Sequence, residues 1–228
     1  MAQASETFVR WYLRFNGYLG VENLVVHEPT PGAVPQGAEF DVVAVRFPFS
    51  LEIPGFELPR DPRLAEIESQ RLINVVIGEV KGGKKPELND PWRAEADDAV
   101  QLRRLKYLVR WIGLYERDEE VEKVAKDLRR AGKSELAHAI RVVYFGARPS
   151  KQAADRSIPQ ILLPDIASWI VNSRAGSWAQ QQVATRSAHD QWDELIKNVW
   201  NLADPALPGT PEGKIASILA LVLGRAVP

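Results

Sequence analysis

The residues of this chain that are best suited to chemistry lie at the end of an apolar segment, residues 72–81, which reads Leu-Ile-Asn-Val-Val-Ile-Gly-Glu-Val-Lys. The segment predicts a β-strand, and because side chains alternate across a strand, Glu79 and Lys81 share the face of Val75 and Ile77. A carboxylate and an ammonium group beside such neighbours must be paired or bound to a metal ion. The pattern therefore suggests a metal site.

A second carboxylate is expected close to this pair. Residues 39–47 read Glu-Phe-Asp-Val-Val-Ala-Val-Arg-Phe and predict another strand, with Asp41 near its start. If the two strands are neighbours, Asp41 and Glu79 meet across one edge of the sheet. Facing carboxylates repel each other unless a cation lies between them. The alternative is a salt bridge between the strands that involves Lys81 and no metal.

Two predicted helices flank these strands. Residues 5–16 form an amphipathic pattern with Glu6 in the first turn, and a later helix reaches about Tyr115, with Gln101 at one end of its buried stripe. Each polar residue also has a simpler interpretation. Glu6 would be an acid that the helix dipole favours, and Gln101 would be solvated at the rim of the stripe.

With these elements in the order helix, strand, strand and helix, the chain resembles the PD-(D/E)XK nuclease superfamily, which has the restriction-endonuclease-like fold. The resemblance covers about residues 6–145 and is carried by Glu6, Asp41, the sequence Glu79-Val80-Lys81, and Gln101. Phe40 stands where the family often has proline, and the stretch between the two acidic strands is longer than usual, which implies an insertion. The fold that the resemblance implies is α/β, with a mixed central β-sheet flanked by helices.

A single nuclease-like domain is expected over residues 1–228. Its core is predicted at about residues 1–147. The insertion, residues 48–71, contains several prolines and predicts an edge hairpin or an ordered loop. Residues 157–228 are expected to add C-terminal helices that pack on the core.

The resemblance also implies an activity, the hydrolysis of phosphodiester bonds by a nuclease that depends on Mg²⁺ or Mn²⁺. Asp41, Glu79 and the backbone carbonyl of Val80 would hold the ion, and Glu6 would complete the site through water or support a second ion. Lys81 would lie beside the attacking water, and Gln101 would orient Lys81 or a phosphate. DNA is expected ahead of RNA, in restriction, phage defence or repair, with a homodimer by analogy.

A second function remains open, a nuclease-like fold of weak or lost activity that binds nucleic acid or assembles into a larger complex. The net charge of −1 and the nearly apolar helix predicted at residues 215–223 favour it slightly, whereas the intact acids and lysine disfavour it. Contacts with nucleic acid would need a local patch, for which the candidates are Lys84, Lys85, Arg103 and Arg104.

Composition sets further limits. The chain has no cysteine, which excludes disulfides and thiolate chemistry and fits a reducing compartment. Its N-terminus lacks the pattern of a secretory signal, and no stretch is apolar for the length of a membrane span. A cytoplasmic protein without membrane contacts is therefore expected.

Overall fold

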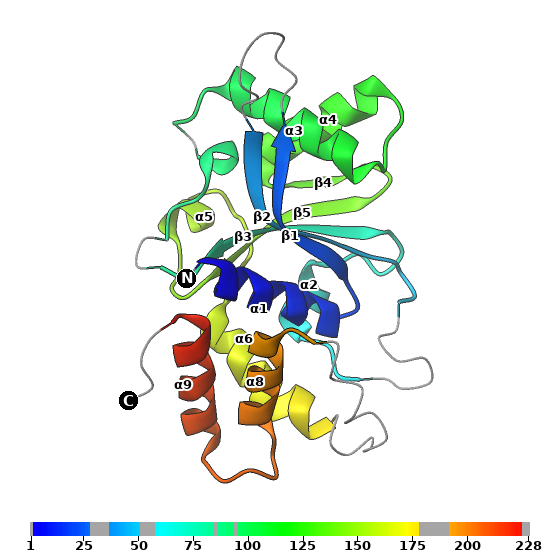
Figure 1. Cartoon of the computed structure of the whole chain (residues 1–228). Coiled ribbons are helices and arrows are strands. Elements are labelled where there is room, and N and C mark those ends of the chain that lie inside the picture. Colours follow the sequence, from blue (N-terminus) through cyan, green and yellow to red (C-terminus); the bar gives the residue numbers. More distant parts are fainter. Residues whose placement is uncertain are drawn as a thin grey trace.

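The computed structural model describes residues 2–27, 37–50, 58–83, 86–93, 95–177 and 192–224 of the 228-residue chain. Its centre is a mixed six-stranded sheet with helices on both faces (Figure 1). The main path of the sheet is β1-β2-β3-β5-β4, and β6 pairs with β5. The predicted α/β architecture, a mixed sheet flanked by helices, is therefore confirmed. The strands are β1 (Leu19–His27), β2 (Gly37–Arg46), β3 (Asn74–Lys81), β4 (Lys133–Glu135), β5 (Ala139–Gly146) and β6 (Gln160–Leu162).

Strand direction changes in the middle of the sheet. β1, β2 and β3 pair antiparallel, whereas β3 and β5 are parallel neighbours. The crossover between β3 and β5 carries two helices that cover one face, α3 (Asp98–Ile112) and α4 (Asp118–Ala131). The other face is covered by α1 (Ala2–Phe15), α6 (Leu163–Trp169) with its continuation η2 (Ile170–Arg174), α8 (Glu194–Ala203) and α9 (Pro211–Val222).

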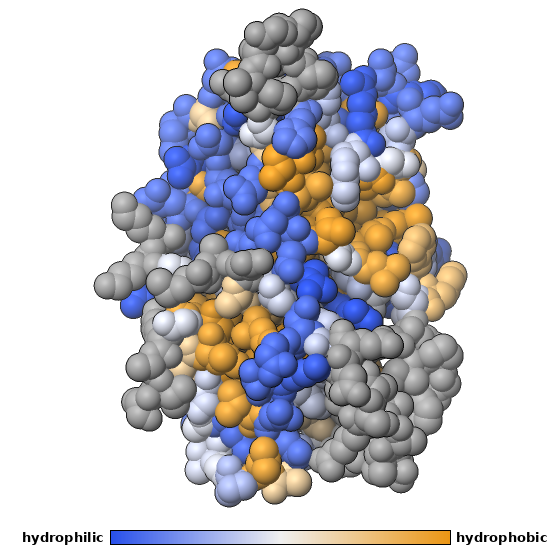
Figure 2. Space-filling model, viewed as in Figure 1, coloured by the Kyte–Doolittle hydropathy of each residue, from blue (hydrophilic) through white to orange (hydrophobic). Residues whose placement is uncertain are grey.

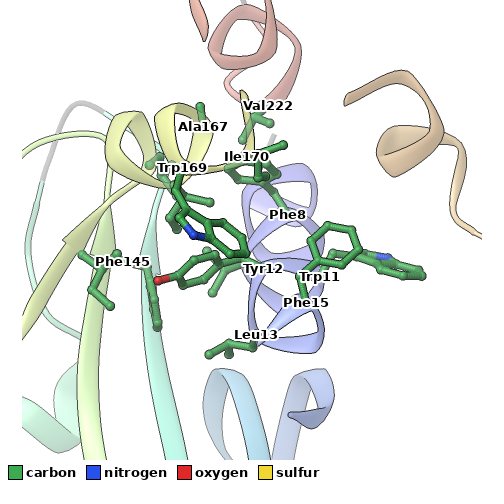
Figure 3. Close-up of a cluster of buried hydrophobic side chains, with 14 of the residues drawn as sticks. Phe8, Trp11, Tyr12, Leu13, Phe15, Phe145, Ala167, Trp169, Ile170 and Val222 are labelled. Atoms are coloured by element: carbon green, nitrogen blue, oxygen red, sulfur yellow. The ribbon is translucent and has the colours of Figure 1, made fainter. Parts of the chain in front are cut away.

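The α1 side of the sheet holds an aromatic core, which we call the α1 core. Phe8 and Tyr12 are fully buried there, and the Tyr12 and Trp169 rings meet edge to face with centroids 5.6 Å apart (Figure 3). Trp11 contacts Trp192, from the segment before α8, at 5.3 Å between centroids. Helices from both ends of the chain therefore share one hydrophobic core.

The opposite side holds the α3 core, which contains Val75 and Ile77 from β3 together with Leu105 and Leu108 from α3. Because side chains alternate along a strand, the next positions of β3 on this face are Glu79 and Lys81. The face predicted for these two residues is thus the one that α3 covers.

Several elements differ from the sequence-based expectations. The insertion contains a short helix, α2 (Pro62–Ile67), because Asp61 caps it and proline is suited to a first helical turn; residues 51–57 lie outside the described residues. The helix expected after β3 is divided into η1 (Asp90–Trp92) and α3, which the Asp97 side chain caps. Strand β4 and helix α5 (Lys151–Asp155) were not predicted, since both are too short to show a period.

No helix among the described residues has both the length and the apolar character needed to cross a lipid bilayer.

Phe8→Ala is expected to lower the free energy of unfolding by about 3–5 kcal/mol, because it leaves a cavity in the α1 core. The matched control is Phe49→Ala, the same change at a side chain that is 92% exposed, which should alter stability by less than about 0.5 kcal/mol. Urea unfolding of both variants measures the difference. Equal unfolding free energies for Phe8→Ala and Phe49→Ala would contradict a contribution of Phe8 to the α1 core.

Candidate functional site

The sheet opens at the position of Asp41. β2 pairs with β3 from Arg46 and Asn74 up to Val42 and Gly78, and the described pairing ends there. Beyond this point β2 continues beside β1 toward α3, as Figure 1 shows. Here β1 contains Asn23 with a positive φ of 55°, which distorts the strand locally. β2 and β3 therefore diverge immediately after Gly78.

The carboxylate of Asp41 lies in this gap. The Val80 backbone N–H donates to Asp41 Oδ2 at 2.7 Å. Because the N–H and C=O of one strand residue point to the same edge, the Val80 carbonyl also faces the gap. The carbonyl of Lys81 points to the other edge, where it accepts from the Ala147 N–H at 3.0 Å. The predicted backbone ligand therefore lies on the same edge as Asp41.

Asp41, Glu79 and Lys81 form one compact cluster. The Lys81 Nζ lies 2.7 Å from Glu79 Oε1 and 3.2 Å from Asp41 Oδ2. Glu79 is 2% exposed and Asp41 is 6% exposed, so the carboxylates are largely removed from water. The structure thus brings together the three residues for which the sequence predicted the closest approach.

A fourth residue, Asn89, completes the cluster, and the sequence analysis did not identify it. Its side-chain carbonyl accepts from Lys81 Nζ at 2.9 Å, and its side-chain amide donates to Asp41 Oδ1 at 3.2 Å. Its backbone N–H donates to Glu79 Oε1 at 2.6 Å. In the sequence Asn89 precedes Asp90 and Pro91, a pattern that indicates only a turn or a helix cap.

The segment that carries Asn89 is fastened to the core. Leu88 is fully buried, and its N–H donates to the Gln152 side chain at 2.9 Å. Trp92, on the other side of Asn89, is 1% exposed and contacts the Phe40 ring edge to face, at 6.2 Å between centroids. Asn89 is therefore fixed on both sides by contacts with the core.

The charges of the cluster do not balance, because two carboxylates face one ammonium. Burial and the neighbouring Asp41 raise the pKa of Glu79 to about 7, although Lys81 and the Asn89 N–H act in the opposite direction. Burial alone would lower the pKa of Lys81, but Glu79 and Asp41 outweigh it and raise that pKa. The cluster is therefore short of positive charge.

Glu6 lies near the cluster from the α1 side. It is 6% exposed, and burial followed by the charge of Asp41 raises its pKa, while a hydrogen bond with the Asn23 side chain lowers it. Within the described ranges, however, no three acidic, histidine or cysteine side chains converge as ligands of one ion. A contribution of Glu6 through water or a second ion stays a prediction.

The donor groups fit Mg²⁺ or Mn²⁺ all the same. Mg²⁺ is commonly held by one or two carboxylates and keeps several waters that substrate phosphates can replace. Asp41 and Glu79 supply two carboxylates, and the Val80 carbonyl faces the same gap. The shortage of positive charge is the condition that a divalent cation would relieve.

The remaining predicted residues are placed as follows. Gln101 is buried in α3, and within the described residues its hydrogen bond is to Arg104 at 3.4 Å, so the orienting role toward Lys81 has no support from direct contact. Arg103 is exposed on the same helix. Lys84 and Lys85 lie outside the described residues.

A polar cavity of about 280 Å³ adjoins the cluster at Asn89. Two guanidinium groups line it, from Arg93 and Arg104, and so do the acids Glu39 and Asp90. A larger cavity of about 1020 Å³ lies between α3 and α4, but its lining mixes both charge signs and includes no residue of the cluster. The smaller cavity is therefore the one suited to a substrate of this site.

Comparison with known protein families, with curated proteins and with solved structures finds no significant match to this chain. Function is therefore inferred from the chemistry of the cluster.

The unfolding free energy of the metal-free protein is expected to fall as pH rises from about 4.5 to about 7. Folded Glu79 has a pKa of about 7 against an ordinary value of 4.5, so the folded state binds more protons across this range. The contribution of Glu79 to the free energy of unfolding is complete below pH 4.5. It is lost between about pH 4.5 and 7, by up to about 1.4 kcal/mol per pH unit. Urea unfolding from pH 4 to 8 measures it.

Glu79→Gln should flatten this dependence, because the amide does not titrate. Glu116→Gln, the same change at an exposed position, should leave it as it is in the wild type. Parallel curves for Glu79→Gln and wild type would show that Glu79 is not the group responsible.

Proposed function

We propose that this protein is a divalent-metal-dependent nuclease with a restriction-endonuclease-like core, and that it hydrolyses phosphodiester bonds. One observation supports this function above others, the convergence of Asp41 from β2 with Glu79 and Lys81 from β3 in one buried, charge-deficient cluster. The order of these residues along the chain supports it as well. DNA is the expected substrate ahead of RNA.

Each residue has a distinct part in the proposed reaction. Asp41 and Glu79 would hold Mg²⁺ or Mn²⁺, which when bound activates water and withdraws charge from the phosphate. Hydrolysis forms a bond from the water oxygen to phosphorus and breaks the bond to one ester oxygen, which leaves as a hydroxyl with a proton that the water gives up. Negative charge builds up on the phosphate in between. Lys81, which lies beside both carboxylates, would stabilise that charge.

A purely structural ion pair accounts for the cluster less well. Buried ion pairs contribute little net stability, and apolar residues of similar volume often do better. Here the single ammonium of Lys81 balances the charge of Glu79, and the buried carboxylate of Asp41 has no second cation among the described residues to balance it. Glu6 is a further acid near Asp41. Such an excess costs stability unless the site binds a cation.

The adjoining cavity supports a phosphate-containing substrate. Arg93 and Arg104 both line it beside Asn89, and a guanidinium group suits the oxygens of a phosphate. In the structure both arginines approach Asp90, at 3.6 Å for Arg93 and 3.9 Å for Arg104. A phosphate of the nucleic-acid backbone would compete with Asp90 for these groups.

One observation favours the second candidate, a module for assembly in a larger complex. The edge strand β1 exposes apolar side chains, with Leu19 at 66%, Val25 at 46% and Val21 at 44% exposure. Figure 2 shows apolar residues gathered on the face where the strands come to the surface. Apolar residues on an unpaired edge are typical of surfaces that join another chain. Binding without cleavage would favour this function.

Plasmid, linear and single-stranded DNA and RNA, incubated with and without Mn²⁺, test the proposal. The wild type should cleave at least one substrate only with the metal. Asp41→Asn should abolish cleavage, and Lys81→Met should lower kcat by about 10²–10³-fold while Mn²⁺ still binds. Asp155→Asn, the same change as at Asp41 but at an exposed position, should cleave like the wild type.

Metal binding has a separate measurement. Mn²⁺ at about a hundredfold over its dissociation constant should stabilise the wild type by about 2.7 kcal/mol and raise its melting temperature. Asp41→Asn should lose this rise and Asp155→Asn should keep it. Cleavage that persists in Asp41→Asn, or that needs no metal, would overturn the proposed mechanism.

A further inference from the structure

The ammonium of Lys81 contacts the two carboxylates that would hold a metal ion. It lies 2.7 Å from Glu79 Oε1 and 3.2 Å from Asp41 Oδ2, whereas Mg²⁺ requires oxygen ligands at about 2.0–2.1 Å. A metal ion held by Asp41 and Glu79 would therefore compete with the ammonium for these carboxylates. Lys81 would give up part of its contact with them when the metal binds.

The ammonium has a further acceptor, on Asn89. An ammonium group has three N–H donors, and the three acceptors found here are Glu79, Asp41 and Asn89. Asn89 is the uncharged one, so a cation would be drawn to the two carboxylates ahead of its carbonyl. With the carboxylates holding the metal, Asn89 would remain as an acceptor for Lys81.

The Asn89 side chain is committed to this cluster. It occupies the N-cap position of η1, where asparagine commonly accepts a hydrogen bond from the helix backbone, yet it makes no such cap. Its carbonyl meets the ammonium and its amide meets the carboxylate of Asp41. Since an ammonium can only donate and a carboxylate can only accept, this orientation of the amide follows from its neighbours.

We infer that Asn89 is a positioning residue that retains the Lys81 ammonium when Asp41 and Glu79 bind the metal, and so keeps Lys81 beside the scissile phosphate. This inference rests on the proposed nuclease function. Asn89 would then influence both the metal affinity and kcat, in each case through the position of Lys81. Its segment is fixed by Leu88 and Trp92, so the acceptor stays in place while the flexible lysine moves.

A double-mutant cycle tests the inference by Mn²⁺ titration calorimetry on wild type, Asn89→Ala, Lys81→Met and the double variant. Asn89→Ala also removes the bond to Asp41, but that loss is the same with or without Lys81. The increase in Kd caused by Asn89→Ala should therefore be about tenfold larger in the presence of Lys81 than in the Lys81→Met background. Equal effects in the two backgrounds, within about twofold, would overturn the inference.

Kinetics supply the second measurement. Asn89→Ala should lower kcat by about tenfold or more when Lys81 is present and by much less in the Lys81→Met background, because its effect on turnover passes through Lys81. Asn89→Gln keeps a carbonyl acceptor for Lys81 and an amide donor for Asp41 without adding a charge, and it should recover part of the lost kcat. Failure of Asn89→Gln to recover any activity would contradict an action through Lys81.

Two controls separate the possible failures. Asn172→Ala, at an exposed asparagine in η2, should match the wild type in both measurements. Melting temperatures in chelator check that each variant is folded. A wild type that binds no Mn²⁺ would overturn the proposed function together with the inference, whereas Mn²⁺ binding without coupling would overturn the role of Asn89 alone.

Discussion

The arrangement of the site depends on a point where two paired strands separate. β2 leaves β3 after the pair of Val42 and Gly78, and the unpaired edge of β3 would otherwise present the N–H of Val80 to a gap. The carboxylate of Asp41 satisfies that N–H and in doing so comes within reach of Glu79 and Lys81. The separation of β2 from β3 thus brings the carboxylates of Asp41 and Glu79 close together in the protein interior.

The rest of the fold keeps this concentration of charge in place. β2 and β3 are inner strands covered on both faces, so the carboxylates stand on rigid backbone. The one loop residue of the cluster, Asn89, belongs to a segment that is also tied to α5, through the Ser150 hydroxyl, which donates to the Pro86 carbonyl at 2.6 Å. Backbone held this closely by its surroundings stays in place when a ligand binds, so that reorganisation is confined to side chains such as Lys81.

Much of the site follows from the sequence because strand periodicity is a local property. Alternation alone places Glu79 and Lys81 on one face of β3, and the apolar run that follows Asp41 identifies the second strand. The separation of β2 from β3 is not local, since it depends on β1 and on α3, and the contact with Asn89 depends on how the chain returns after Lys81. Gln101 shows the same difference between local and non-local information. Its burial follows from helical spacing in the sequence, but its hydrogen bond with Arg104 depends on side-chain conformations that the spacing does not determine.

The α1 core has a consequence for how the chain reaches its native state. Helix α1 comes from the first residues, yet the side chains that enclose it include Ile196, Ile218 and Val222, some two hundred positions later. Contacts of such long sequence separation require closure of a very large loop, which slows folding. During synthesis on the ribosome the apolar face of α1 stays without its full set of partners until α8 and α9 have emerged, and over that interval it is a natural target for chaperones.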